Sequence, residues 1–215
     1  MSVSFDPRSA ALLAIDMQRD FLDPRGYAAR AGLDIELLRR AIPGVKRLLE
    51  AARKTGLTVV HTREANAADL SDVPPEFMAA TQRTGAPVGA PGPLGRLLIR
   101  GEHGTGIVDE LAPLPGEIEI DKPGFSAFEA TALGAMLNTR GVRTLLICGV
   151  TTEVCVSSTL RSAVDRGFRC ITVGDACASA YPDLHDAALR MIGVEGGVFG
   201  QVVTAAEVAA FLASC

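Results

Sequence analysis

The 215-residue sequence contains no tryptophan, only two tyrosines and no cluster of lysine and arginine residues. Its formal net charge is -4, so the chain offers no positive patch for phosphate backbones or anionic lipid. No apolar run approaches the roughly 18 residues needed to cross a bilayer, and the N-terminus lacks the basic-then-apolar pattern of a signal peptide. We therefore expect a cytoplasmic protein with neither nucleic acid nor membrane as a partner.

The five cysteines form no C-x-x-C pair, and no histidine lies at zinc-finger spacing from them. This pattern disfavours disulfides and a structural zinc site. In a reducing compartment a cysteine is by default a small buried apolar residue, so a reactive one needs a special environment. The five are Cys148, Cys155, Cys170, Cys177 and Cys215.

Apolar runs of strand length alternate with segments of helical periodicity. Hydrophobic residues make up 48% of the chain, and its length fits a single domain over residues 1–215. The predicted strands cover 10–15, 57–61, 117–120, 144–148, 169–173 and 201–204, and the predicted helices 43–54, 129–138, 153–166, 182–192 and 205–212. This alternation predicts an α/β fold, a Rossmann-like three-layer αβα sandwich with a six-stranded parallel sheet.

The segment from about 64 to 116 departs from this alternation. Seven of the twelve prolines fall in it, together with many glycines. Long connections of this kind often carry binding functions. We expect it to pass over the active-site side of the sheet or to reach a neighbouring subunit.

Three chemically competent side chains follow predicted strands. Asp16 follows the first strand, Lys122 the third, and Cys155 lies in a turn after the fourth. Ligands of open parallel sheets bind at the carboxyl ends of the strands. The sequence therefore predicts that a carboxylate, an amine and a thiol meet at one edge.

These three groups suffice for nucleophilic hydrolysis. A helix start and a nearby ammonium from Lys122 lower a thiol's pKa, so we expect Cys155 to be ionised. Asp16 then serves as general base and acid, and the backbone amides of Thr151 and Cys155 form an oxyanion hole. Each residue also has a structural interpretation, as a core cysteine, a turn-forming aspartate or a solvated lysine.

The chain resembles the isochorismatase-like cysteine hydrolases, which include nicotinamidases, N-carbamoylsarcosine amidase and ureide-cleaving amidohydrolases. The motifs are A-L-L-A-I-D-M-Q-R-D-F, L-T-V-V-H-T-R, I-D-K-P, G-V-T-T-E-V-C-V, G-D-A-C-A-S and G-G-V-F-G. The resemblance implies the isochorismatase-like hydrolase fold, a catalytic triad of Asp16, Lys122 and Cys155, and a cis peptide between Val150 and Thr151. It also implies hydrolysis of an amide C–N bond through a thioester. A cysteine nucleophile argues against the vinyl-ether cleavage of isochorismatase itself.

Metal-dependent nicotinamidases carry a D-x-H motif after the second strand, and the region after the predicted second strand of this sequence lacks it. The three histidines, His61, His103 and His185, are scattered, so we predict no catalytic metal and no cofactor. The segments 68–75, 92–96 and 100–102 resemble the branch that cleaves biuret, triuret and ureidoacrylate. With so few aromatic residues, we expect little surface for stacking a pyridine ring.

Three further residues are candidates for substrate binding. Phe21 and Phe125 lie close in sequence to Asp16 and Lys122, so each is a candidate wall of the pocket. Glu195 precedes two glycines, and its carboxylate would accept hydrogen bonds from a donor-rich ureide. Alternatively, Glu195 only caps a turn.

Three functional hypotheses remain at this stage. The leading one is a metal-independent amidohydrolase acting on a small linear ureide of the biuret or triuret type. The second is a nicotinamidase or an amidase for N-carbamoyl amino acids or ureidoacrylate. The third is an interaction protein with an inert site. The relatives form dimers and tetramers, so we also expect a homo-oligomer.

Overall fold

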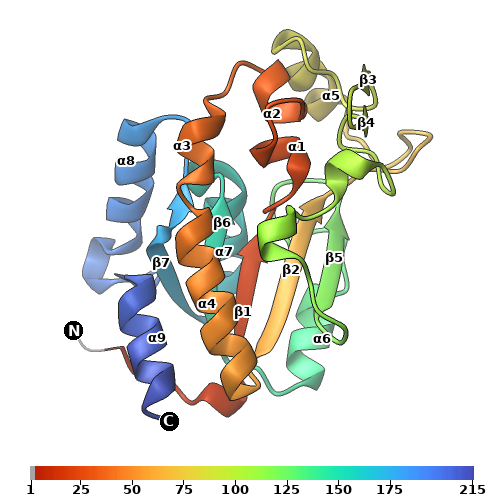
Figure 1. The fold of residues 1–215 in the computed structure, drawn as a ribbon. Coiled ribbons are helices and arrows are strands. Elements are labelled where there is room, and N and C mark those ends of the chain that lie inside the picture. Colours follow the sequence, from red (N-terminus) through yellow and green to blue (C-terminus); the bar gives the residue numbers. More distant parts are fainter. Residues whose placement is uncertain (1–2) are drawn as a thin grey trace.

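The computed structural model describes residues 3–215 and shows one sheet between two layers of helices (Figure 1). All six strands of this sheet are parallel, in the order β5-β2-β1-β6-β7-β8. The strands are β1 (Ala10–Ile15), β2 (Thr58–Glu64), β5 (Ile118–Lys122), β6 (Thr144–Val150), β7 (Arg169–Ala178) and β8 (Gln201–Val203). The predicted six-stranded αβα sandwich is therefore confirmed.

Helices cover both faces of the sheet. On one face α4 packs against α9 and crosses β1, β2 and β7, while α6 and α7 lie behind the sheet in Figure 1. The helices are α1 (Arg19–Leu22), α2 (Tyr27–Arg30), α3 (Ile35–Arg39), α4 (Ile42–Thr55), α5 (Pro75–Arg83), α6 (Leu133–Thr139), α7 (Ser157–Asp165), α8 (Pro182–Ile192) and α9 (Ala205–Ala213). Within residues 3–215, none of these is both long and apolar enough to cross a bilayer.

The sequence pattern of α4 explains why it forms. Val45, Leu48, Leu49 and Ala52 share one face and are buried, and Gly56 ends the helix with a φ of 69°. Glycine suits this left-handed backbone conformation because a side chain on any other residue would be sterically strained there. The predicted helix over 43–54 is thus extended by only one residue at each end.

The sheet has its topological switch between β1 and β6. From β1 the chain moves outward to β2, and from β6 it moves the other way to β7. Side chains that follow β1 and β6 therefore face the same crevice, the usual ligand site of such sheets. Gly149 permits the close pairing of these strands, because a Cβ there would collide with the carbonyl oxygen of Ile15.

The long segment between β2 and β5 contains ordered structure. It holds α5 and a short hairpin of β3 (Pro91–Gly92) and β4 (Gly95–Arg96). Asp20, which is buried just after β1, accepts hydrogen bonds from the backbone N–H groups of Leu98 (3.0 Å) and Tyr27 (3.3 Å). Burial raises the pKa of Asp20 to about 6. The bond from Leu98 ties this segment to the chain that follows β1 and Asp16.

Candidate active site

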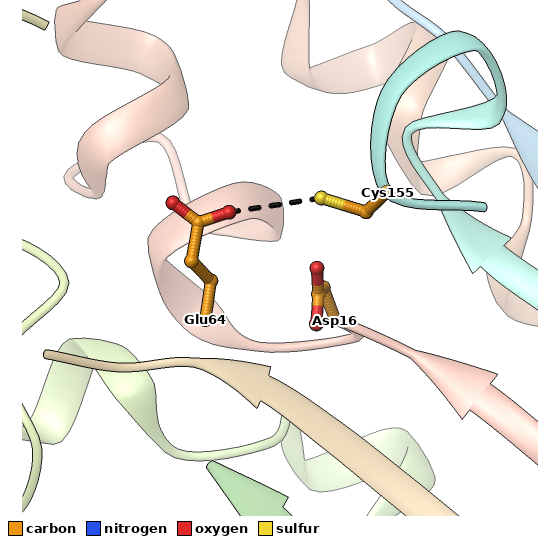
Figure 2. Close-up of side chains that lie close together, drawn as sticks. All are labelled: Asp16, Glu64 and Cys155. Atoms are coloured by element: carbon orange, nitrogen blue, oxygen red, sulfur yellow. Dashed lines mark hydrogen bonds between the residues drawn. The ribbon is translucent and has the colours of Figure 1, made fainter. Parts of the chain in front are cut away.

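The three residues singled out in the sequence meet at the carboxyl edge of the sheet. The Lys122 Nζ lies 2.8 Å from Asp16 Oδ2 and 3.6 Å from the Sγ of Cys155. A fourth residue, Glu64, joins them at the end of β2, with its Oε2 3.6 Å from the same sulfur (Figure 2). We call Asp16, Glu64, Lys122 and Cys155 the buried cluster.

Asp16 is held by the neighbouring strand β2. Its backbone N–H donates to the Thr62 carbonyl oxygen at 3.1 Å, and the Thr62 hydroxyl donates to its Oδ1 at 2.7 Å. Asp16 has a φ of 53°, a left-handed conformation that aspartate tolerates better than most residues. The turn out of β1 thus directs a fully buried carboxylate toward Lys122.

Lys122 is the last residue of β5 and has no exposed surface. Burial disfavours its charged form, but Asp16 and the other acidic groups of the buried cluster outweigh burial and raise the pKa of its ammonium. The Nζ also donates to the Gly124 carbonyl oxygen at 2.7 Å. Lys122 is therefore a fixed positive charge between the Asp16 carboxylate and the Cys155 sulfur.

Cys155 lies in a π-helical turn, Thr152–Val156, that precedes α7. Single π turns of this kind often occur at functional sites. The peptide bond between Val150 and Thr151 is cis, as the resemblance implies. The amide N–H of Thr151 makes no hydrogen bond to another residue within 3–215, so it is free to serve as a donor at the site.

The expectation that Cys155 is ionised is wrong for the free protein. Burial raises the pKa of its thiol well above the usual value, and Lys122 opposes this shift without reversing it. Two carboxylates in the buried cluster add to the increase, because a thiolate beside them would give the buried group excess negative charge. The resting nucleophile is therefore a thiol that must lose its proton during the reaction.

Glu64 was missed by the sequence reasoning. Glu64 is only 3% exposed, and burial raises the pKa of its carboxyl group to about 7. The predicted strand ended at His61, whereas β2 continues to Glu64 and pairs it in register with Lys122 on β5. The signal was present in the segment His61-Thr-Arg-Glu64, at the end of a strand beside Asp16.

A cavity of about 250 Å³ opens beside Cys155. Its wall is mainly apolar and contains five aromatic rings. The lining residues are Phe21, Tyr27, Leu33, Glu64, Phe77, Ala80, Thr81, Thr84, Phe125, Thr151, Glu153, Val154, Cys155 and Tyr181. Phe21 and Phe125 thus lie where the sequence placed them. The expected shortage of aromatic surface is wrong, because the fold gathers half of the ten aromatic residues around one cavity.

Glu195 lies away from the cavity. It is exposed, sits in a short helical turn after α8 with a φ of 50°, and is absent from the lining of the cavity at Cys155. The structure therefore does not bring it together with the buried cluster. The position is a turn, which agrees with the alternative interpretation.

The buried cluster also offers three ligand-type atoms, from Asp16, Glu64 and Cys155, within 4.8 Å of one another. Lys122 already supplies a cation at this place, with its Nζ 2.8 Å from Asp16 and 3.8 Å from Glu64. A divalent ion would have to share the position with this ammonium, which like-charge repulsion opposes. These residues therefore fit an ion pair better than a metal site.

The three histidines lie outside the buried cluster. His61 is buried on β2, where it contacts Glu117 at 2.9 Å, and burial lowers its pKa. His185 contacts the Thr152 hydroxyl at 2.8 Å from α8. Neither belongs to a group of three potential ligands in residues 3–215.

Comparisons with known proteins agree with this architecture. The protein-family model described as the isochorismatase domain matches residues 10–207 of this chain. A cysteine hydrolase from Pseudomonas syringae pv. phaseolicola shares 28% identity, covering 98% of this chain and 95% of its own, with a TM-score of 0.82. An isochorismatase family protein from Desulfovibrio vulgaris shares 30% identity over 96% of this chain and 99% of its own, with a TM-score of 0.79.

A third solved structure, N-carbamoylsarcosine amidase from Thermoplasma acidophilum, has the same fold. It shares 24% identity, covering 92% of this chain and 96% of its own, with a TM-score of 0.69. The matched domain spans all six strands of the sheet and every member of the buried cluster. The chain therefore belongs to the isochorismatase family of hydrolases, as its motifs predicted.

Proposed function

We propose that this protein is a cysteine-dependent amidohydrolase that cleaves a C–N amide bond of a small uncharged substrate. The observation that carries the proposal is the position of Cys155, whose sulfur lies in the cavity wall and 3.6 Å from the Lys122 ammonium. A thiol in a cavity, with a fixed cation and carboxylates beside it, has the components of nucleophilic catalysis. The N-carbamoylsarcosine amidase with the same fold is compatible with this chemistry.

The reaction begins with removal of the thiol proton. As the Cys155 sulfur attacks the amide carbon, its proton passes to Asp16, the base that the sequence predicts. Lys122 stabilises the negative charge on sulfur during this step. A carboxyl group of the buried cluster then gives a proton to the nitrogen as the C–N bond breaks, and ammonia or an amine leaves. Water attacks the thioester and gives a proton to that carboxylate, and the departing sulfur takes its proton back from Asp16, which regenerates the thiol.

The attacked carbonyl oxygen also needs donors that are already in place. The amides of Thr151 and Cys155 flank the turn after β6, and both residues line the cavity. Preset N–H groups of this kind stabilise the oxyanion of a tetrahedral intermediate. We propose these two amides as the oxyanion hole.

The lining of the cavity favours a neutral substrate. Among residues 3–215, those that line it include the carboxyl groups of Glu64 and Glu153 but no lysine, arginine or histidine. An anion such as an N-carbamoyl amino acid or ureidoacrylate would find no cation to pair with there. Uncharged linear ureides of the biuret type therefore remain the leading candidates.

The aromatic rings favour a second candidate. Phe77 and Phe125 meet edge to face with centroids 5.3 Å apart, and Phe21 meets Tyr27 at 5.7 Å. Such walls bind apolar or ring-containing groups through area burial and stacking. A primary carboxamide with an aromatic group, as in nicotinamide, is the second candidate substrate.

The test is a release assay on Cys155→Ala and Cys155→Ser. We expect the wild-type protein to release ammonia or amine from at least one compound among biuret, triuret, ureidoacrylate, N-carbamoyl amino acids and nicotinamide. Both variants should lose this turnover while remaining folded by circular dichroism. Full turnover in Cys155→Ala would exclude the thiol as nucleophile.

A matched control removes a different buried thiol. Cys170 is the second residue of β7, at the opposite end of the sheet, and is 2% exposed. Cys170→Ala should therefore keep the turnover of the wild-type protein. If no compound is turned over and an activated ester does not acylate Cys155, the site is inert and the interaction-protein hypothesis is favoured.

A further inference from the structure

Two carboxylates lie near the reacting sulfur, since the ligand-type atoms of Asp16, Glu64 and Cys155 lie within 4.8 Å of one another. The two carboxylates differ in access to the cavity. Asp16 is fully buried, is bound by Lys122 and Thr62, and does not line the cavity. Glu64 does line it. A substrate nitrogen or a water molecule in the cavity can therefore reach Glu64 more directly than Asp16.

We infer that Glu64 is a second catalytic acid and base, which exchanges protons with the substrate while Asp16 exchanges its proton with the sulfur of Cys155. This inference rests on the proposed hydrolase function. It assigns separate steps to the two carboxylates at one nucleophile. Nothing in the family motifs quoted from the sequence includes Glu64.

The steps balance as follows. The sulfur gives its proton to Asp16 and attacks the amide carbon, and protonated Glu64 gives its proton to the nitrogen as the C–N bond breaks. Water then attacks the thioester and gives a proton to the Glu64 carboxylate, which restores its protonated form. The departing sulfur takes its proton back from Asp16, so both carboxylates return to their starting states.

The geometry supports a role at the reacting atoms. Glu64 Oε2 lies 3.6 Å from the Cys155 sulfur and 3.8 Å from the Lys122 ammonium. Figure 2 shows the Glu64 side chain pointing toward Cys155 from the side opposite the end of β6. The carbonyl carbon of a thioester is bonded directly to this sulfur. It therefore lies one bond away from the atom that Glu64 Oε2 approaches.

The backbone of Glu64 is fixed by Gln18. The Gln18 side chain donates to the Glu64 carbonyl oxygen at 3.0 Å and accepts from the Glu64 N–H at 2.8 Å. Gln18 is fully buried and stands two residues after Asp16, so the loop after β1 sets the position of both carboxylates. We assign Gln18 as a positioning residue.

The protonation state of Glu64 suits this role. Burial raises its pKa to about 7, so both its forms are populated near neutral pH, as a group that alternately gives and takes a proton requires. The ionisable groups that surround it are Lys122, Asp16, Cys155, Asp20 and Tyr27. Lys122 is the only cation among them.

The test compares Glu64→Gln on two substrates with different leaving groups. Ammonia needs a proton to leave, whereas 4-nitrophenolate leaves without one. We therefore expect Glu64→Gln to slow amide turnover by about 10²–10⁴-fold, the usual contribution of general acid–base catalysis. With 4-nitrophenyl acetate, the variant should show a burst of nitrophenolate near the wild-type rate, followed by slow hydrolysis of the acyl-enzyme.

Two further measurements separate proton transfer from a structural effect. The wild-type rate of amide acylation should fall as the pH rises through the Glu64 pKa near 7, and Glu64→Gln should lose this decrease. Formate added to Glu64→Ala should restore part of the amide turnover. These readouts also apply if Glu64→Gln folds poorly, since Glu64→Ala provides an independent variant.

The matched control is Glu153→Gln, which neutralises the other carboxyl group of the cavity wall. It should change amide and ester turnover by a common factor and leave no slow acyl-enzyme. A nitrophenolate burst that is slowed in Glu64→Gln as much as amide turnover, or unchanged amide turnover, would overturn the inference. The proposed function fails separately, when the wild-type protein shows neither amide turnover nor a Cys155-dependent burst.

Discussion

Replacing Lys122 with methionine tests how the thiol is activated. The ammonium lies 3.6 Å from the Cys155 sulfur. At an effective dielectric constant of about 20, two unit charges at this separation interact by about 5 kcal/mol. This energy corresponds to a factor of about 10³–10⁴ in the thiolate population, so Lys122→Met should slow alkylation of Cys155 by about 10³–10⁴-fold.

The assay is alkylation by iodoacetamide between pH 6 and 10, followed by peptide mass spectrometry. Cys215 is exposed and provides an internal reference in the same sample. In the wild-type protein Cys155 should react more slowly than Cys215 at pH 8, because burial keeps its thiol protonated. In Lys122→Met the ratio of the two rates should fall further.

Loss of Lys122 also leaves Asp16 as an unpaired buried charge. Breaking a buried ion pair costs about 3–5 kcal/mol, so the variant should unfold at a lower urea concentration. The double variant Asp16→Asn/Lys122→Met removes both charges and should recover stability without recovering thiol reactivity. An unchanged alkylation profile in a folded Lys122→Met would refute the electrostatic role of Lys122.

Two further predictions concern stability. Thr62→Val removes the hydroxyl that donates to Asp16 Oδ1 at 2.7 Å. Because a buried charged acceptor then loses its partner, the free energy of unfolding measured in urea should fall by about 1–3 kcal/mol. An unchanged midpoint of urea unfolding would contradict this. Because burial raises the pKa of Glu64 from 4.5 to about 7, the folded protein binds this proton more tightly than the unfolded chain. Stability from Glu64 should therefore fall by about 3 kcal/mol as the pH rises from 4.5 to above 7, and Glu64→Gln should lack this decrease in urea titrations at several pH values.

The order of elements was predictable because periodicity is a property of the sequence itself. The strands β1 and β6 are continuous apolar runs, and α8 begins at Pro182 and ends at Ile192, as the pattern indicated. The short helices α1, α2 and α3 were missed, because four or five residues give too little periodicity to recognise. The predicted strands also ended too early where the sequence turned polar.

Those polar strand ends are where the site lies. Lys122 and Glu64 are strand residues whose hydrogen-bonded backbones hold charged side chains in the interior. Strand prediction from apolar patterns stops before such residues. It therefore predicts the sheet but misses charged residues at the strand ends, where part of the site lies. Asp16, Lys122 and Cys155 were predicted because each follows a predicted apolar strand, whereas Glu64, three residues beyond the predicted end of its strand at His61, was missed.

The state of the thiol could not be predicted from composition or spacing. The sequence indicates a cation near Cys155, but the pKa depends on how much water and how many carboxylates surround the sulfur. Only the folded structure shows that burial and Glu64 outweigh Lys122. In the same way, residues far apart in sequence, such as Tyr27, Phe77 and Tyr181, become one cavity wall only in three dimensions.

The helix α5 has an evolutionary consequence. It supplies Phe77, Ala80 and Thr81 to the cavity wall, yet Thr81 is the sole residue of the helix that is buried. Substitutions at partly exposed positions usually change stability by little, whereas those in the sheet change it by more. New substrate preferences can therefore arise by mutation on this helix while the reacting atoms keep their positions.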